Sequence, residues 1–295
     1  MSVRSTAATS HSIDHVIETA RAHPSVRAIV IPPCPDSLVR LQEIASAPEL
    51  DSQALEQLAS SDVAMAAAVI RTANSPLYAL AQPVQTVGMA LTVLGLQPAL
   101  ELLSAFITRN ALHVRTPLLE HFWESSQRKA IACEHIGRQL YSFDPGLGYS
   151  FGLFCHVGMP VLVKAVRGYA GTVTEALARK DRTFTQTENA AHRTDHAVMG
   201  AIVARTWHLP PDVAQAIWLH HDFSCLSDER FDATVRHLVA LGLLAEYLVH
   251  HHENLTPTRE WTLHGQACMD HLYVTQDELN HWIDELYPAF EAVAL

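Results

Sequence analysis

Hydrophobic residues recur at helical spacing along most of the sequence and almost nowhere alternate with polar residues as they do in a half-buried strand. The one strand-like run, residues 27–31, ends at Pro32-Pro33, and proline is a boundary signal for a strand. With 295 residues, of which 48% are hydrophobic, the chain can bury a large core. The pattern therefore predicts an all-α fold that is helical nearly throughout.

Capping residues and prolines divide this pattern into helices. One helix is predicted to begin at Asp62 or the serine before it and to end at Asn74, because Pro76 disfavours a helical conformation just before it. Another runs from Thr86 to Gly95, since glycine suits a C-terminal cap. Further helices are expected after residues 36 and 51 and over residues 98–112, 117–140, 172–179, 187–207, 210–221, 232–252 and from residue 275 onward.

Three of these helix starts are inferred from side chains that cap a helix. Thr172 with Glu175 matches a capping box, as does the later pair at residues 275 and 278. Thr187 with Glu188 is interpreted as the start of the helix that runs to residue 207.

The charge balance argues against several classes of partner. Twenty basic residues stand against 31 acidic ones, a formal charge of −11, whereas binding to nucleic acid or to an anionic membrane needs basic surface. The first residues hold no apolar core of a signal peptide, and no uninterrupted apolar stretch approaches 18 residues. We therefore expect a cytoplasmic protein that binds neither nucleic acid nor membrane.

The cysteines are odd in number, widely spaced and never arranged as a CxxC pair. This usage argues against a disulfide framework and against a cysteine zinc site. We expect reduced thiols in the core at Cys34, Cys133, Cys155, Cys225 and Cys268.

Residues 62–106, together with the proline-bracketed segment at 31–35, resemble the HDOD family of bacterial signalling domains, which descends from the HD phosphohydrolases. The features that carry the resemblance are the Asn74-Ser75 pair after a helix of small residues and the Leu-Gly ending at Gly95. Asn74, Ser75 and Gly95 are interpreted as structural, because ending helices accounts for their chemistry.

The resemblance implies a helical N-terminal lobe packed on a degenerate HD-type helical lobe. The expected division is an N-terminal extension at 1–30, the N-terminal lobe at 31–115, the HD-like lobe at 116–252 and an acidic helical extension at 253–295. The apolar stripe in that last segment is interpreted as packing on the chain's own core or as a helix offered to a basic partner.

The chain has 19 histidines, and 15 of them lie after residue 115. By resemblance to the HD lineage, four occupy positions where that lineage has metal ligands: His156, His196, His220 and His221. The lineage's first histidine is replaced by Ser125, the aspartate of its His-Asp pair by Val157, and its distal aspartate by a residue near Gly242. Proline replaces a lysine at Met159-Pro160. Four imidazoles thus remain without the expected carboxylates.

These losses leave three interpretations of the four histidines. They are packed relics, or they bind one transition-metal ion weakly, or they serve a rearranged hydrolase site. Loss of the bridging carboxylate argues against catalysis by the ancestral route. Neutral imidazole nevertheless suits zinc, nickel or iron, so we keep a single metal ion as the alternative to no cofactor.

The resemblance implies a non-catalytic signal-transduction module, not an enzyme, that binds other signalling proteins. Only about thirty residues precede the resemblance, so we expect a stand-alone regulator or adaptor without a receiver, cyclase or kinase domain. The alternative is a metal-dependent phosphohydrolase that uses a rearranged histidine cluster.

Overall fold

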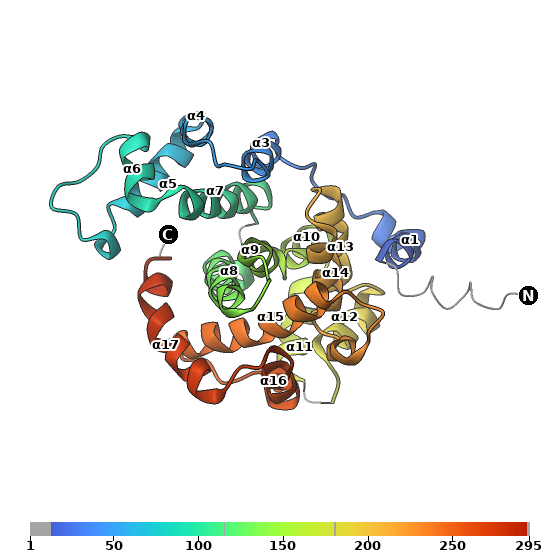
Figure 1. Cartoon of the computed structure of the whole chain (residues 1–295). Helices are drawn as coiled ribbons and strands as arrows, with labels where there is room; N and C mark the ends of the chain where they lie inside the picture. Colours follow the sequence, from blue (N-terminus) through green and yellow to red (C-terminus); the bar gives the residue numbers. More distant parts are fainter. Residues whose placement is uncertain (1–12, 115, 180, 294–295) are drawn as a thin grey trace, which may run out of the picture. The chain divides into compact units, whose positions relative to one another are not determined.

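The computed structural model describes residues 13–114, 116–179 and 181–293, and every regular element in those ranges is a helix (Figure 1). The predicted all-α class is confirmed. The chain divides into two compact units. Within the described ranges, the larger unit holds residues 13–31 and 114–286, and the smaller unit holds residues 32–113 and 287–293. Residues 13–31 and residues 253–286 of the acidic segment belong to the larger unit.

The smaller unit holds five complete α-helices, and three of them start at predicted caps, which are Asp51, Asp62 and Thr86. Asp36 does not cap its helix, because the residue before the helix is Pro35, and the helix predicted from residue 98 starts at Leu96. Asp62 accepts hydrogen bonds from the backbone amides of Ala64 and Met65, and Thr86 accepts one from Met89. Leucine is the most frequent residue in its core. Its helices are α3 (Asp36–Ala45), α4 (Ser52–Ser60), α5 (Val63–Ala73), α6 (Val87–Leu94) and α7 (Leu96–Ala111), with a 3₁₀ turn, η2, at Pro76–Tyr78.

Asn74 and Gly95 shape the connections of this unit. The Asn74 amide donates to the carbonyl of Val84 at 2.9 Å, and its oxygen accepts from the Val84 amide at 2.8 Å, which closes the loop after α5. Ser75 begins that loop, and its amide donates to the carbonyl of Thr72. Gly95 has a φ of +83° at the point where α6 and α7 meet at 114°. A left-handed conformation of this kind favours glycine.

The larger unit begins with α1 (Ile13–Ala22), α2 (Pro24–Arg27) and the 3₁₀ turn η3 (Pro117–Leu119), and continues with α8 (Phe122–Gln139), α9 (Pro145–Phe154), α10 (Gly158–Ala165), α11 (Tyr169–Ala178), α12 (Phe184–His192) and α13 (His196–Thr206). It is completed by α14 (Pro211–Leu219), η4 (Phe223–Ser227), α15 (Ala233–His252), α16 (Arg259–Leu272) and the part of α17 (Gln276–Glu291) before residue 287. The apolar stripe of α17 is turned inward in this unit, since Leu279 and Trp282 are buried.

The helix starts predicted at Thr172 and Thr187 differ from those observed. The helix predicted from Thr172 begins at Tyr169, after Gly168 in a left-handed conformation. The single helix predicted over 187–207 is two helices, α12 and α13. Thr183 and Gln186 form a capping box one turn before Thr187, so α12 starts there and Glu188 falls inside it.

Glycines let the helices of the larger unit approach one another closely. A Cβ at Gly152 would lie 2.6 Å from the Ala130 Cα, so α9 rests on the backbone of α8. The segment Pro145–Ala165, which holds α9 and α10, is long and apolar enough to cross a membrane by length and composition, and 67% of its most apolar part is buried in the structure. Helices that are apolar all round are found in protein cores as well as in membranes.

Gly158 allows α10 to contact the start of α13, where the candidate site lies. A Cβ at Gly158 would stand 2.1 Å from the backbone oxygen of His196. We expect Gly158→Ala to lower the free energy of unfolding by about 3 kcal/mol, the upper end of the usual cost of overpacking. Gly171→Ala in α11 is the control, because nothing lies within 4 Å of its Cβ. Urea denaturation measures both, and equal stability of the two variants would contradict the close approach.

Candidate metal centre

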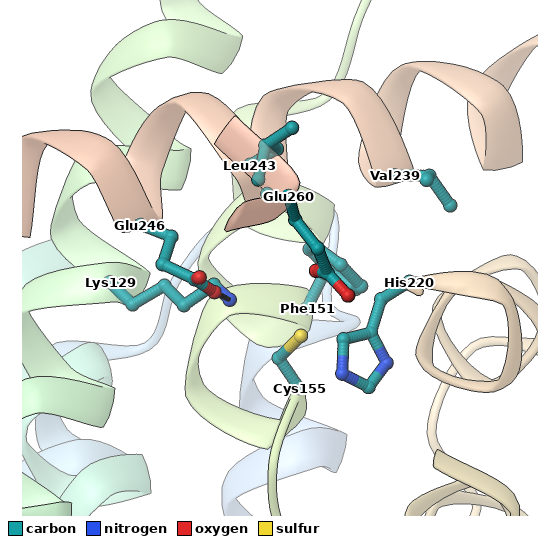
Figure 2. A pocket seen from close by; sticks show the side chains of 9 residues that line it. Lys129, Phe151, Cys155, His220, Val239, Leu243, Glu246 and Glu260 are labelled. Atoms are coloured by element: carbon teal, nitrogen blue, oxygen red, sulfur yellow. Dashed lines mark hydrogen bonds and ion pairs between the residues drawn. The ribbon is translucent and has the colours of Figure 1, made fainter. Parts of the chain in front are cut away.

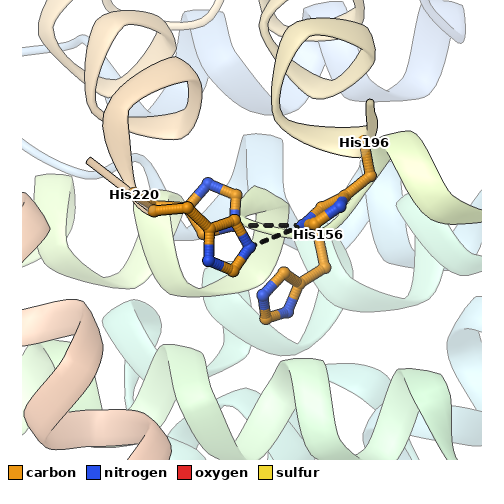
Figure 3. A group of neighbouring side chains, drawn as sticks. His156, His196 and His220 are labelled. Carbon is orange, nitrogen blue, oxygen red and sulfur yellow. Dashed lines mark hydrogen bonds between the residues drawn. The ribbon is translucent and has the colours of Figure 1, made fainter. Parts of the chain in front are cut away.

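The four histidines come together from three parts of the larger unit. His156 lies between α9 and α10, His196 is the first residue of α13, and His220 and His221 directly follow α14. Each offers one ring nitrogen, and these four atoms lie within 4.8 Å of one another (Figure 3). Among the residues that the structure describes, this is the one group of three or more histidine, cysteine or carboxylate side chains arranged to hold a metal ion.

Three of the four rings are held through Nδ1 by an oxygen atom. His196 Nδ1 lies 2.8 Å from Glu188 Oε2, and His220 Nδ1 lies 2.6 Å from the carbonyl oxygen of Ile217. His221 Nδ1 lies 2.8 and 2.9 Å from the two carboxylate oxygens of Glu260. A carbonyl and an ionised carboxylate only accept hydrogen bonds, so each Nδ1 carries the proton and donates. In a neutral ring this leaves a lone pair on Nε2.

These Nε2 atoms face one another. His196 Nε2 lies 3.2 Å from His220 Nε2 and 3.0 Å from His221 Nε2 (Figure 3). Lone pairs at such distances repel unless a cation lies between them. Four nitrogens at the usual zinc–nitrogen distance of about 2.0–2.1 Å in a tetrahedron are about 3.3–3.4 Å apart. The two distances from His196 come close to this spacing, and the four nitrogens together span up to 4.8 Å. The donor set therefore fits one transition-metal ion, with His156 as the fourth ligand.

Burial keeps two of the ligands in the neutral form that binds metal. It lowers the pKa of His156 and of His220 well below the usual value for histidine. Burial alone would also lower the pKa of His221, but the facing Glu260 carboxylate outweighs it and the pKa is raised. For Glu188, burial alone would raise the pKa, but His196 outweighs it and the pKa is lowered.

The cluster has negative charge close by to balance a cation. Glu188 is fully buried and also accepts a hydrogen bond from the Tyr169 hydroxyl and one from the His196 amide. Glu260 is partly buried at the start of α16. Two ionised carboxylates bonded to ligand rings would offset the two charges of a divalent ion.

A small cavity lies beside the cluster, lined in part by Lys129, Cys155, His220, Glu246 and Glu260 (Figure 2). The volume open to the centre of a water molecule is about 10 Å³, which is room for about one water. The buried Lys129 and the partly buried Glu246 form an ion pair at 3.0 Å. Burial raises the pKa of the Cys155 thiol to about 11, so it remains protonated and is a poor ligand.

The positions that lost the lineage's metal ligands have taken other roles. The Ser125 hydroxyl donates to Glu253 at 2.6 Å, and Val157 is fully buried. The Phe151 ring fills the space beside Gly242, where a Cβ would stand 2.6 Å from the ring. An aspartate at residue 242 would require Phe151 to move.

Sequence reasoning missed three carboxylates near the cluster. The sequence pattern marks Glu188 only as a residue near a helix start, although it lies eight residues before His196. Glu260 fell in the predicted acidic extension. Glu246 follows Gly242 by one helical turn on α15, so a search for acids one turn away would have found it.

The sequence matches the family model of the HDOD domain over residues 31–223. A curated relative, an uncharacterized protein of Treponema pallidum (strain Nichols), is 23% identical over 202 residues, which are 68% of this chain and 39% of that protein. The chain thus spans about two fifths of the length of that relative.

Several solved structures share the fold. An HDOD domain protein from Geobacter sulfurreducens is 20% identical, with a TM-score of 0.75 and coverage of 96% of this chain and 98% of that one. A Marinobacter aquaeolei protein provisionally described as a signal transduction protein is 21% identical, with a TM-score of 0.71 and coverage of 97% and 64%. A Shewanella amazonensis protein provisionally described as a phosphohydrolase is 18% identical, with a TM-score of 0.68 and coverage of 97% of each chain.

Proposed function

The chain belongs to the HDOD domain family, and from this we propose that it is a non-catalytic regulator or adaptor that acts by binding other signalling proteins. We also propose that its four histidines hold one transition-metal ion in a structural role. The family and the fold relatives support a signalling-related HD-like module. The structural role of the metal rests on the site itself.

The observation that carries the metal proposal is the inward-facing set of Nε2 atoms whose rings are anchored through Nδ1. Metal-binding histidines generally donate their other ring N–H to a carboxylate or a backbone carbonyl. Four imidazoles complete a tetrahedral shell, and closed shells are typical of structural sites, whereas catalytic zinc keeps a position for water. The donor set therefore favours a structural ion over a hydrolytic one.

The alternative function is a metal-dependent phosphohydrolase. It is favoured by the one-water cavity beside His220, where Glu246 and Glu260 supply carboxylates. A hydrolase of this kind would use fewer than four histidines as ligands and hold a metal-activated water. The free space in this cavity is far smaller than the pockets of about 300–1,000 Å³ that usually enclose small-molecule ligands.

A metal titration combined with an activity screen tests the two functions together. Protein stripped with a chelator is titrated with Zn²⁺, Ni²⁺ and Co²⁺, and phosphomonoester and phosphodiester substrates are then offered to each loaded form. We expect one ion per chain and no turnover in any form. Turnover that is lost in His156→Ala would contradict the non-catalytic proposal and support the hydrolase.

The binding of signalling proteins needs its own test. We expect the purified chain to form a complex with a receiver, kinase or cyclase domain from its native bacterium that survives gel filtration. Failure to bind any member of a complete panel of those domains would contradict the adaptor role.

A further inference from the structure

Glu260 connects the histidine cluster to a helix outside the family match. The HDOD model ends at residue 223, and α16 begins at residue 259. Glu260 lies in the first turn of α16, and both of its carboxylate oxygens lie within 2.9 Å of His221 Nδ1. A segment beyond the matched domain therefore supplies one of the anchors of the candidate metal centre.

The rest of α16 is held by packing. The Trp261 ring stacks on Tyr247 of α15 with centroids 4.1 Å apart, and His264 stacks on Phe223 of η4 at 4.6 Å. Cys268 and Met269 are buried on the same helix. The link that leads into α16 is exposed over residues 254–257. The helix is thus packed against its neighbours and preceded by an exposed link, and Glu260 accepts its hydrogen bond from the cluster.

A metal ion bound at His221 Nε2 fixes the orientation of the ring and therefore the direction of its Nδ1–H bond. The proton then points at Glu260, and a cation on Nε2 strengthens the attraction to that carboxylate. Coupling between two binding equilibria is reciprocal. If docked α16 strengthens metal binding by a given free energy, bound metal therefore stabilises the docking of α16 by the same free energy.

We propose that Glu260 is a positioning residue of the metal centre, so that metal binding and the docking of α16 stabilise each other. This inference rests on the proposed metal site and gives that site a regulatory role, in which metal occupancy controls how firmly α16 is docked. Metal binding would then change how firmly the face of α16 that carries the exposed Leu263 is held in place.

Hydrogen exchange of the full chain with and without Zn²⁺ tests this coupling directly. In the native protein, we expect saturating Zn²⁺ to slow exchange of the α16 amides by about 10–100-fold, the size of a typical effect of such an anchor on metal affinity. Glu260→Ala should lose this slowing and bind Zn²⁺ about 10–100-fold more weakly, with Glu260→Gln in between because an amide oxygen still accepts. The Co²⁺ absorption spectrum should also shift in Glu260→Ala, since the orientation of the His221 ring is no longer fixed.

Asp270→Asn is the matched control, because Asp270 is an exposed acid of the same helix whose side chain bonds only to Gln266 among the contacts described. It should behave as the native protein does. Unchanged α16 exchange on metal binding by the native protein, or equal Zn²⁺ affinity in Glu260→Ala, would overturn the coupling and leave the metal site intact. Failure of the native protein to bind any ion would overturn the metal site and the coupling with it.

Discussion

Replacing His196 with alanine is expected to weaken metal binding by more than about 100-fold, beyond the loss typical of a missing anchor, because it removes the ligand whose Nε2 faces both His220 and His221. The same change should lower the free energy of unfolding by about 3 kcal/mol, since it leaves the buried Glu188 carboxylate without the ring N–H that donates to it. Metal titration and urea denaturation measure the two effects.

A second variant separates the two effects. His196→Ala combined with Glu188→Gln removes the unpaired charge and should recover part of the stability without recovering metal binding. Native-like metal affinity in His196→Ala would contradict the ligand assignment. Loss of stability that Glu188→Gln does not relieve would contradict the role given to the buried carboxylate.

The second large effect is expected at the ion pair beside the cluster. Lys129→Met should lower the free energy of unfolding by about 3 kcal/mol, the lower end of the usual cost, because the partly buried Glu246 then loses its cation. Lys129→Met with Glu246→Leu should recover most of this loss, since an apolar pair of similar volume often replaces a buried ion pair at little cost. Urea denaturation of the single and double variants measures the coupling, and equal stability of the two would contradict it.

The same pair predicts a pH dependence. Burial alone would raise the pKa of Glu246, but the charge of Lys129 outweighs it, so the pKa is lowered. A carboxyl group whose pKa is lower in the folded than in the unfolded protein stabilises the fold above its unfolded pKa of about 4.3. That contribution is lost as the pH falls through the lower, folded pKa. Below about pH 4 we therefore expect the difference in stability between the native protein and Lys129→Met to shrink, as measured by urea denaturation over a pH series.

Much of the fold follows from local signals in the sequence. Asp62, Thr86 and Asp232 begin helices where the sequence places caps, and Gly95 ends one where a left-handed residue is needed. The prediction fails at Thr187 because a capping box one turn earlier starts the helix first. Competition between neighbouring caps is a local effect, but side-chain spacing alone does not decide which cap is used.

The sequence predicts the histidines of the candidate site but not the carboxylates that anchor their rings. Resemblance identified the four histidines, because their residue types survive at the lineage's positions. The carboxylates that anchor these rings could not be found in that way. Glu188 lies on α12 at none of the positions compared with the lineage's ligands, and Glu260 lies on α16, outside the matched family region. Which carboxylate reaches which ring depends on how the helices pack, and no spacing in the sequence encodes that distance.

The metal environment measured by X-ray absorption on the zinc-loaded chain tests the central claim most directly. We predict one zinc ion per chain with four nitrogen ligands of imidazole type at about 2.0–2.1 Å. A shell with oxygen ligands in place of one or more imidazoles would contradict the closed four-histidine site and support the hydrolase. A chain that retains no zinc after desalting would contradict the metal centre itself.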